Sequence, residues 1–600
     1  MTSKPPRWDL SNVYPGLDSA ELAKDIEWVK SATEALRMYY HEKLAPVDAS
    51  SSPEAINQAV SSVVDRLNEL MSKAATIRSY FHSFISTDSY NQYAMRMGSQ
   101  FDQVMVELQK VNVLLETWVG QLKDQLPAAL ALGGSAKAHA FPVMEIAEQS
   151  QYLMSEKEEI LSSELNLSGA NAWSKLQGTV TSQKTVEFEL DGKVQALPMP
   201  ALINLHAHPD EDVRKRAYAA EFEAWESIKE PLAASMNGVK GWVNTLNQHR
   251  GRVDALHAPI DQARIDRETL DVMMEAMKDS FPTFRRYFKA KAARFGGEAL
   301  PWWNLFAPTG KLDKSYSFDE AADLILTNFE KFSPDLRAFA QSAFDNNWID
   351  AEQRPGKRGG AFCMSLPEVK ESRILCNFDG SLDQVFTIAH ELGHGYHNYN
   401  MFQAGKTPLQ RQTPMTMAET ASIMCETIVF NAVMDTIDEP EAELALLETA
   451  LIGDAQVIVD IYSRFLFEKE VFERRVKSEL SADELCEIME DAQAQTYGEG
   501  LDPAYRHKFM WTWKPHYYYA GLSFYNFPYA FGKLFGVGLY AIYQQRGAAF
   551  IPDYKQLLSS TGEAPAAELA ARFGIDIRSK GFWADSLAVI GKHVDRYCEL

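Results

Sequence analysis

Several features that mark large classes of protein are missing from the 600-residue sequence. It contains no run of 18 apolar residues, and the opening MTSKPPRW has no apolar signal region, so neither a membrane span nor a secretion signal is predicted. Basic runs are absent too, and 59 Lys and Arg against 82 Asp and Glu give a net charge of −23. This excess of negative charge argues against nucleic acid and anionic membranes as partners. We expect a soluble, cytoplasmic protein.

Cysteine is scarce, with five residues that are widely spaced and form no C-x-x-C pair. Scattered thiols in odd number are typical of proteins in a reducing compartment. The sequence also has neither a P-loop nor a G-x-S-x-G motif, so no motif supports phosphate binding or serine-hydrolase chemistry. Apolar residues are plentiful at 46%, which is enough for a large buried core.

Most of the chain has the period of amphipathic helices. Apolar residues at spacings of three and four predict helices near residues 18–44, 52–84, 88–125, 141–163, 266–294 and 316–345. Alternation around Asp191-Gly192 predicts a β-hairpin over 186–197. We place a boundary there, between an N-terminal helical domain of residues 1–197 and a second domain of residues 198–600.

Residues 390–394 read H-E-L-G-H and contain the pattern H-E-x-x-H. Apolar spacing predicts a helix from residue 382 onward, with Ser381 or Asp379 as its cap. On that helix His390 and His394 lie one turn apart on one face, which suits Zn²⁺, and Glu391 can reach a water on the metal. The five letters alone fit an ordinary histidine-bearing helix equally well, so a further ligand has to decide.

The further ligand is expected from another element. His397 would stand roughly 10 Å along the helix from His390, too far for a shared metal, so we place it beside the site and not among the ligands. A second apolar helix is predicted from residue 414, and it carries Glu419 and Glu426 seven residues apart on one face. We interpret Glu419 as a ligand and Glu426 as a group that orients a ligand from behind. Pairing of either carboxylate with Lys or Arg elsewhere is the alternative.

Known zinc-peptidase patterns can be compared with this spacing. The metzincin pattern fails, because Gly and His would be needed where His397 and Asn400 stand. The sequence resembles, over nearly its whole length, the M3 family of zinc peptidases, the thimet oligopeptidase and oligoendopeptidase F group. In that family H-E-x-G-H is followed after 24 residues by the ligand Glu, the spacing of His394 and Glu419. The resemblance implies one Zn²⁺ per chain and a metalloendopeptidase with Glu391 as general base.

The segment 511–529 is rich in His and Tyr, which can donate hydrogen bonds to the oxyanion of peptide hydrolysis. It resembles the donor segment of M3 peptidases, most closely in the oligoendopeptidase F branch. The resemblance maps His516, Tyr525 and Tyr529 onto the residues that bind the transition state. Which tyrosine has which role stays open, and His507 is a weaker rival to His516.

The segment 356–362 (GKRGGAF) is a glycine-rich turn before a predicted strand, and residues 373–378 form a second predicted strand. An edge strand there would bind an extended peptide by main-chain hydrogen bonds. The segment resembles the part of M3 peptidases that lines the substrate channel, and we assign substrate binding to Gly359, Gly360, Arg373, Ile374 and Leu375. For the two basic residues of the turn, an ordinary solvated turn is the alternative.

Together these patterns predict a mainly α-helical fold with a small β-sheet beside the H-E-x-x-H helix. The resemblance adds a two-lobed helical bowl with a central substrate channel, and short unstructured peptides as substrates. Two other functions stay open: a dipeptidyl carboxypeptidase that uses the same site, and a peptide-binding carrier without catalysis. The ligands would also accept Mn²⁺ or Co²⁺.

Overall fold

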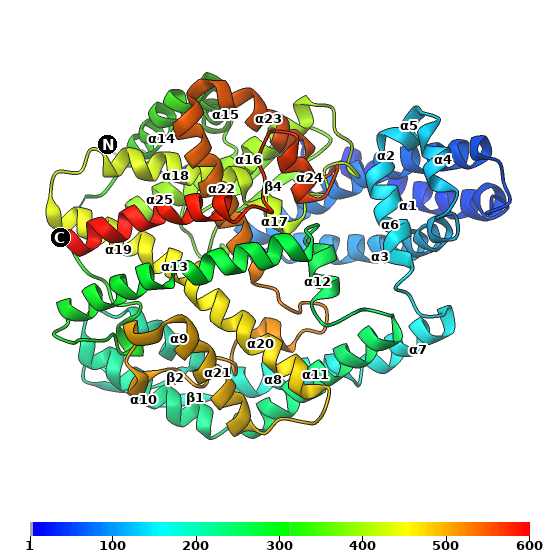
Figure 1. The fold of residues 1–600 in the computed structure, drawn as a ribbon. Helices are drawn as coiled ribbons and strands as arrows, with labels where there is room; N and C mark the ends of the chain where they lie inside the picture. Colours follow the sequence, from blue (N-terminus) through cyan, green and yellow to red (C-terminus); the bar gives the residue numbers. More distant parts are fainter. Residues whose placement is uncertain (1–3, 312–313) are drawn as a thin grey trace. The chain divides into compact units, whose positions relative to one another are not determined.

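A computed structural model describes residues 4–311 and 314–600, and it confirms the mainly α-helical fold (Figure 1). The chain divides into two compact units, each assembled from three stretches of the sequence. The first unit comprises the chain up to Tyr152, Lys314–Val433 and Ile542–Gly574; the second comprises Leu153–Asp313, Met434–Ala541 and Ile575–Leu600. The domain boundary expected after residue 197 falls inside the second unit and stays a prediction.

Three long helices, α1, α2 and α3, pack side by side in the first unit (Figure 1). Each begins at a capping side chain, Ser19, Ser52 or Asn91, that accepts a hydrogen bond from the N–H of the third residue of the helix. The helices of this unit are α1 (Ala20–Tyr39), α2 (Pro53–Thr87), α3 (Gln92–Gln121), α4 (Leu126–Ala131), α5 (Gly134–Ala138), α6 (Ala140–Ser150), α14 (Phe318–Phe332), α15 (Pro334–Asp345), α16 (Leu382–Gln403), α17 (Met415–Ala418), α18 (Thr420–Met434), α23 (Ile551–Ser560) and α24 (Ala566–Ala571).

One of the predicted helices is divided. The segment 316–345 forms α14 and α15, which meet at Pro334. Proline has no N–H to continue a helix but fits its first position, so the chain ends one helix and starts the next there. Ser317 starts α14 with a capping box, in which Glu320 reaches back to the Ser317 N–H.

A small three-stranded sheet lies beside α16, as predicted. It consists of β3 (Ile349–Asp350), β4 (Phe362–Leu366) and β5 (Glu371–Leu375), in the order β3-β5-β4. Strands β4 and β5 are antiparallel with Phe362 opposite Leu375, and β3 is parallel to β5. Strand β4 is therefore an edge strand, whereas β5 has a neighbour on each side.

The second unit is again helical, with the predicted hairpin near its start. Strands β1 (Thr185–Leu190) and β2 (Lys193–Pro198) pair through a two-residue turn in which Asp191 and Gly192 both have positive φ, the conformation such turns require. Its helices are α7 (Glu156–Asn166), α8 (Ala170–Gln183), α9 (Met199–Asn204), α10 (Glu211–Glu226), α11 (Lys229–His249), α12 (His257–Gln262), α13 (Arg267–Arg294), α19 (Pro440–Ala455), α20 (Ile461–Arg475), α21 (Ala482–Thr496), α25 (Lys580–Glu599) and most of α22 (Phe527–Arg546), whose end from Ile542 belongs to the first unit.

Two further features concern the class of protein. In the part of the chain that the structure describes, no helix combines the length and apolar character that crossing a membrane requires. All five cysteines are free thiols.

Candidate active site

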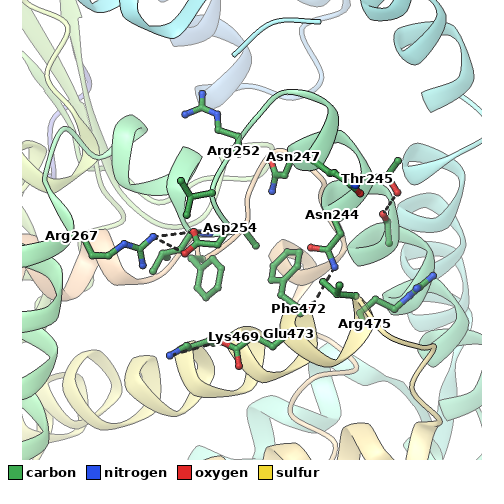
Figure 2. A pocket seen from close by; sticks show the side chains of 17 residues that line it. Asn244, Thr245, Asn247, Arg252, Asp254, Arg267, Lys469, Phe472, Glu473 and Arg475 are labelled. Atoms are coloured by element: carbon green, nitrogen blue, oxygen red, sulfur yellow. Dashed lines mark hydrogen bonds and ion pairs between the residues drawn. The ribbon is translucent and has the colours of Figure 1, made fainter. Parts of the chain in front are cut away.

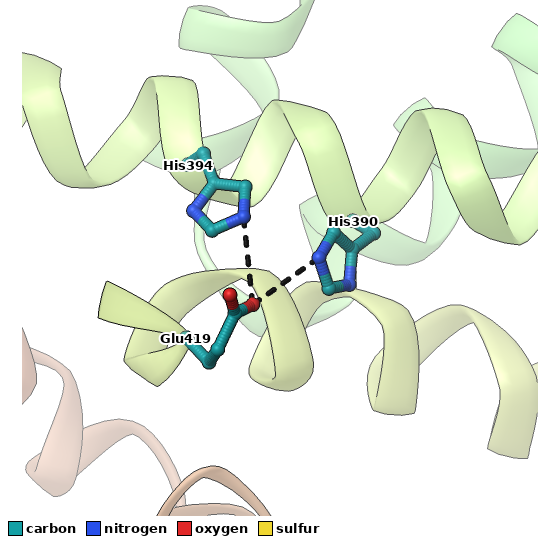
Figure 3. Close-up of side chains that lie close together, drawn as sticks. All are labelled: His390, His394 and Glu419. Carbon is teal, nitrogen blue, oxygen red and sulfur yellow. Dashed lines mark ion pairs between the residues drawn. The ribbon is translucent and has the colours of Figure 1, made fainter. Parts of the chain in front are cut away.

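Helix α16 carries both histidines of the H-E-x-x-H pattern. Ser381 caps the helix by accepting a hydrogen bond from the Gln384 N–H. From one face of α16 the side chains of His390 and His394 point toward Glu419 (Figure 3). The Oε2 atom of Glu419 lies 3.2 Å from Nε2 of His390 and 3.4 Å from Nε2 of His394.

Glu419 stands at a break between two helices, where the sequence predicted one continuous helix. Helix α17 ends at Ala418 and α18 begins at Thr420, and Glu419 between them has φ −85° and ψ 3°. The Ser422 hydroxyl, one turn on, donates a 2.6 Å hydrogen bond to Oε2 of Glu419. The break and this hydrogen bond fix the carboxylate in place.

Gly393 lets the two helices come close together. A Cβ atom added at Gly393 would lie 2.5 Å from both the Ala421 carbonyl oxygen and the Ser422 Cα. Both contacts are with backbone atoms of α18, which cannot move aside as a flexible side chain would. Any larger residue at position 393 therefore has to push α18, and Glu419 at its start, away from α16.

The three donor atoms fit a zinc ion. One ligand atom from each of His390, His394 and Glu419 lies within 4.8 Å of the others. Two bonds of 2.0–2.1 Å at a tetrahedral angle separate their ligand atoms by about 3.3 Å, which matches the distances from Glu419 to the two histidines. Two imidazoles and a carboxylate are also a common catalytic zinc set. Across residues 4–311 and 314–600, no other group of His, Cys, Asp or Glu has such spacing.

Glu391 lies beside this triangle and is only 6% exposed. Its Oε2 atom is buried without a hydrogen-bond partner. Burial raises the pKa of Glu391 to about 7, although His390 opposes the shift. A buried carboxylate with an unused acceptor and a pKa near neutrality suits a general base.

Glu426 contacts the back of His390, with Oε2 2.8 Å from the ring Nδ1. This is the contact by which a carboxylate orients a metal-binding imidazole. Burial lowers the pKa of His390, but Glu419 and Glu426 outweigh it and raise the pKa to about 10. Burial lowers the pKa of His394 to about 4. Without a metal, Glu419 and Glu426 therefore keep His390 protonated. The same negative charge would stabilise a metal cation at this position.

His397, expected beside the site, lies in the same cavity but outside the donor triangle. It is buried, and its Nε2 atom is 2.9 Å from the Thr561 hydroxyl. The cavity has a volume of about 590 Å³. Ala361, Phe362 and Cys363, at the start of edge strand β4, line it together with the metal-site residues.

The predicted substrate-binding residues have different surroundings. Gly359 and Gly360 are exposed in the turn before β4, with no atom within 4 Å of an added Cβ. Arg373, Ile374 and Leu375 are buried in β5, which is paired on both sides, so a peptide cannot add to that strand. The edge strands are β3 and β4, and of these β4 begins at the metal cavity.

The solvated-turn alternative is wrong for one of the two basic residues. The Lys357 ammonium is buried, 2.7 Å from Oδ1 of Asp350, and donates hydrogen bonds to the carbonyl oxygens of Asp350, Glu352 and Cys376. It ties the glycine-rich turn to the sheet.

His516, Tyr525 and Tyr529 form one cluster in the second unit. The hydroxyls of Tyr525 and Tyr529 are 2.7 Å apart, and the rings of His516 and Tyr525 are 5.8 Å apart. Asn526 donates a 2.8 Å hydrogen bond to Nε2 of His516, which leaves the ring proton on Nδ1. Burial, reinforced by nearby cations, lowers the pKa of His516 to about 3, so the imidazole is neutral at neutral pH. Tyr529 is 37% exposed.

A buried ion pair holds the loop that carries Tyr525. Lys240 Nζ lies 2.6 Å from Oε1 of Glu468, and both side chains are buried. The other carboxylate oxygen of Glu468 accepts a 3.0 Å hydrogen bond from the Phe524 N–H. Phe524 has a φ of 53°, in the left-handed region that a bulky residue adopts only when its surroundings impose it. Glu468 therefore supports a strained backbone next to Tyr525.

His507, the rival to His516, belongs with His206 to a separate buried network. His507 Nε2 is 2.9 Å from Oε1 of Glu221, and His206 Nε2 is 3.0 Å from Oε2. The Trp225 indole N–H also donates to Glu221. Glu221 therefore holds His206, which is buried, in the interior. The Nδ1 atom of His208 accepts a hydrogen bond from the N–H of Asp210, the residue that caps α10.

A helix with H-E-x-x-H, a carboxylate from a neighbouring helix and an unpartnered buried glutamate define a metallohydrolase centre. Residues 204–589 match the model of Peptidase family M3, and the chain belongs to that family. It is a metallopeptidase, for which the family implies a divalent metal and peptide substrates.

Named relatives agree with this assignment. The chain is 21% identical over 578 residues to oligopeptidase PepF of Bacillus subtilis, covering 95% of this chain and 84% of that protein. It is 22% identical to an oligoendopeptidase F homologue of Lactococcus lactis, with 96% and 94% coverage. A crystal structure from Chlamydophila abortus matches with a TM-score of 0.85 at 18% identity over 100% of both chains. Oligoendopeptidase-F from Enterococcus faecium matches with a TM-score of 0.67 at 18% identity, covering 96% and 97%.

Sequence reasoning missed Ser422, Arg411 and the Lys240–Glu468 pair. Ser422 was detectable in principle, because a hydroxyl three residues after Glu419 can reach it at a helix start. The roles of Arg411, Lys240 and Glu468 depend on contacts between distant parts of the chain, which a local sequence pattern does not predict.

Proposed function

We propose that the protein is a zinc-dependent oligoendopeptidase that cleaves internal bonds of short, unstructured peptides. The observation that carries the proposal is the donor triangle of His390, His394 and Glu419 beside the buried, unpartnered Oε2 of Glu391. A carrier that only binds peptides has no use for such a base. The free thiols are compatible with the cytoplasm, where we place the protein.

When bound, zinc polarises the scissile carbonyl and lowers the pKa of a coordinated water toward about 7. Glu391 accepts the proton of the attacking water at Oε2 and then passes it to the leaving amine. Glu426 keeps the His390 ring oriented through its 2.8 Å contact with Nδ1. Ser422 holds Glu419 in the same way.

We assign oxyanion stabilisation to the cluster of His516, Tyr525 and Tyr529. Asn526 already occupies Nε2 of His516, so the remaining imidazole donor is the Nδ1–H. The hydroxyls of Tyr525 and Tyr529 are hydrogen-bonded to each other, and a tyrosine hydroxyl is a suitable donor to an oxyanion. Removal of one such donor costs roughly 100- to 1,000-fold in kcat by the precedent of oxyanion holes.

The free edge of β4 is the proposed site of peptide pairing. Its first residues line the metal cavity, and Gly359 and Gly360 leave open space before it. Main-chain hydrogen bonds to a strand edge recognise an extended peptide with little regard to its side chains. A folded protein does not present such a free, extended segment.

The test is hydrolysis of an internally quenched peptide of about ten residues. Both ends are blocked, and the zinc-loaded protein is compared with its Glu391→Gln variant at equal zinc content. We expect cleavage at an internal bond by the wild type alone. Cleavage only of peptides with a free carboxyl terminus, two residues from the end, would indicate a dipeptidyl carboxypeptidase. Binding without cleavage of either kind would indicate a carrier and refute the proposal.

A further inference from the structure

Arg411 is the one Arg or Lys among the residues that line the metal cavity. It lies in the loop between α16 and α17, and the structure gives its guanidinium no ion pair or hydrogen bond with a described residue. The Nε atom is buried without any partner. Its side chain rests on Phe402, with the guanidinium carbon 4.5 Å from the ring centroid. Burial alone lowers the pKa of Arg411, to about 10, and it remains a cation at neutral pH.

The arginines of another cavity provide a contrast. A cavity of about 530 Å³ in the second unit is lined by Arg252, Arg267 and Arg475 (Figure 2). Arg267 lies 2.8 Å from Asp254, Arg252 pairs with Asp261, and Arg475 donates to the Asn237 carbonyl oxygen. In a chain with a net charge of −23, carboxylates are available to pair with a cation. Arg411 is half-buried, and an arginine held partly out of water without a partner is costly unless a ligand supplies one.

The loop around Arg411 is fixed at several points. The Arg411 N–H donates to the Thr407 carbonyl oxygen, and the Leu409 N–H donates to Oδ1 of Asn68. At Gly562 an added Cβ would lie 2.1 Å from the Gln410 carbonyl oxygen, so the loop packs directly on the backbone there. The guanidinium is therefore presented to the cavity by a defined backbone.

We propose that Arg411 binds a carboxylate of the peptide substrate inside the metal cavity and makes the enzyme selective for peptides that carry one there. The inference rests on the proposed peptidase function. A guanidinium with unused N–H donors matches the two oxygens of a carboxylate. The carboxylate belongs either to the peptide's own C-terminus or to an Asp or Glu side chain, and the two sources are chemically alike.

The experiment uses two matched pairs of internally quenched peptides with the full-length, zinc-loaded protein. One pair differs only in a free or amidated C-terminus. The other pair is blocked at both ends and differs only in Glu or Gln at one position after the cleaved bond, scanned over three positions. The variants are Arg411→Met, Arg411→Lys, and Arg267→Met as the control from the other cavity.

We expect the wild type to favour the carboxylate member of one pair by roughly 10- to 100-fold in kcat/KM, the range for hydrogen bonds to a charged group. Arg411→Met should bring this ratio to about one through KM, without changing hydrolysis of the neutral peptides or zinc content. Arg411→Lys should retain part of the ratio, and Arg267→Met all of it. The pair that loses its preference identifies the source of the carboxylate.

Equal rates within both pairs for the wild type would overturn the inference, as would a preference that survives in Arg411→Met. Cleavage of the blocked neutral peptide by the wild type, but not by Glu391→Gln, would leave the proposed function intact in either case. If no peptide is cut, the binding of the same pairs to the Glu391→Gln protein, with and without Arg411→Met, still tests the role of Arg411.

Discussion

Replacement of Gly393 by Ala tests whether the metal site depends on the close approach of α16 and α18. The added Cβ would lie 2.5 Å from the Ala421 carbonyl oxygen and the Ser422 Cα. Ordinary contacts between such atoms are about 3.5 Å, so α18 has to move by about 1 Å. Ligand distances in a metal site are fixed to within about 0.2 Å, and a shift of this size displaces Glu419 from bonding range.

Two opposing terms act on stability in Gly393→Ala. Alanine favours a helix over glycine by about 1 kcal/mol, whereas overpacking costs about 1–3 kcal/mol. The metal-free protein should therefore lose at most about 2 kcal/mol, the difference between these terms. Zinc affinity should fall by roughly 10- to 100-fold, the range observed when contacts that support metal ligands are lost. The metal site should thus suffer more than the fold.

The assay is a zinc titration in competition with a chromophoric chelator, with denaturant unfolding of the metal-free proteins beside it. Gly453→Ala is the matched control, because it makes the same change within α19, where no atom lies within 4 Å of the added Cβ. The control should bind zinc as the wild type does. Wild-type affinity in Gly393→Ala would show that the approach of the two helices does not set the ligand geometry.

Three other predictions follow from the site. Glu419→Ala should lose zinc while Glu391→Gln keeps it, and Glu426→Gln should bind it roughly 10- to 100-fold more weakly in the same titration; full zinc occupancy in Glu419→Ala would instead point to Glu426 as the ligand. Burial lowers the pKa of His516 from 6.5 to about 3, so between these values the unfolded chain binds a proton that the folded protein does not. Stability of the metal-free protein should therefore fall as the pH drops from 6.5 toward 3, and less steeply in His516→Asn; equal slopes in urea unfolding would contradict this. The double variant Lys240→Met/Glu468→Leu should have a kcat lower by roughly 10- to 100-fold at similar KM. The double variant Lys240→Met/Glu468→Gln keeps an acceptor for the Phe524 N–H and should keep its kcat. Equal kcat in the two double variants would mean that the ion pair only stabilises the fold.

Local patterns were sufficient for much of the fold. The cap at Ser381 and the apolar spacing predicted α16, and Asp191-Gly192 predicted the hairpin turn, because those signals lie within a few residues of one another. The order of the small sheet was beyond such reasoning. Arg373, Ile374 and Leu375 have the composition of a strand, but only the chain's long-range pairing makes β5 central and β4 the edge. The same limit applies to Glu419, whose helix breaks in a contact with α16.

For Lys357 and Arg411, the structure distinguishes a structural role from a functional one, which the sequence does not. Both are basic residues in polar segments between regular elements, and each sequence context fits a solvated turn. The fold surrounds the Lys357 ammonium with Asp350 and three carbonyl oxygens, so its charge is satisfied and its role is structural. Around the Arg411 guanidinium it leaves an aromatic ring and the open metal cavity. Because a charge held partly out of water favours a counterpart, Arg411, which has none in the protein, indicates that the substrate supplies a carboxylate.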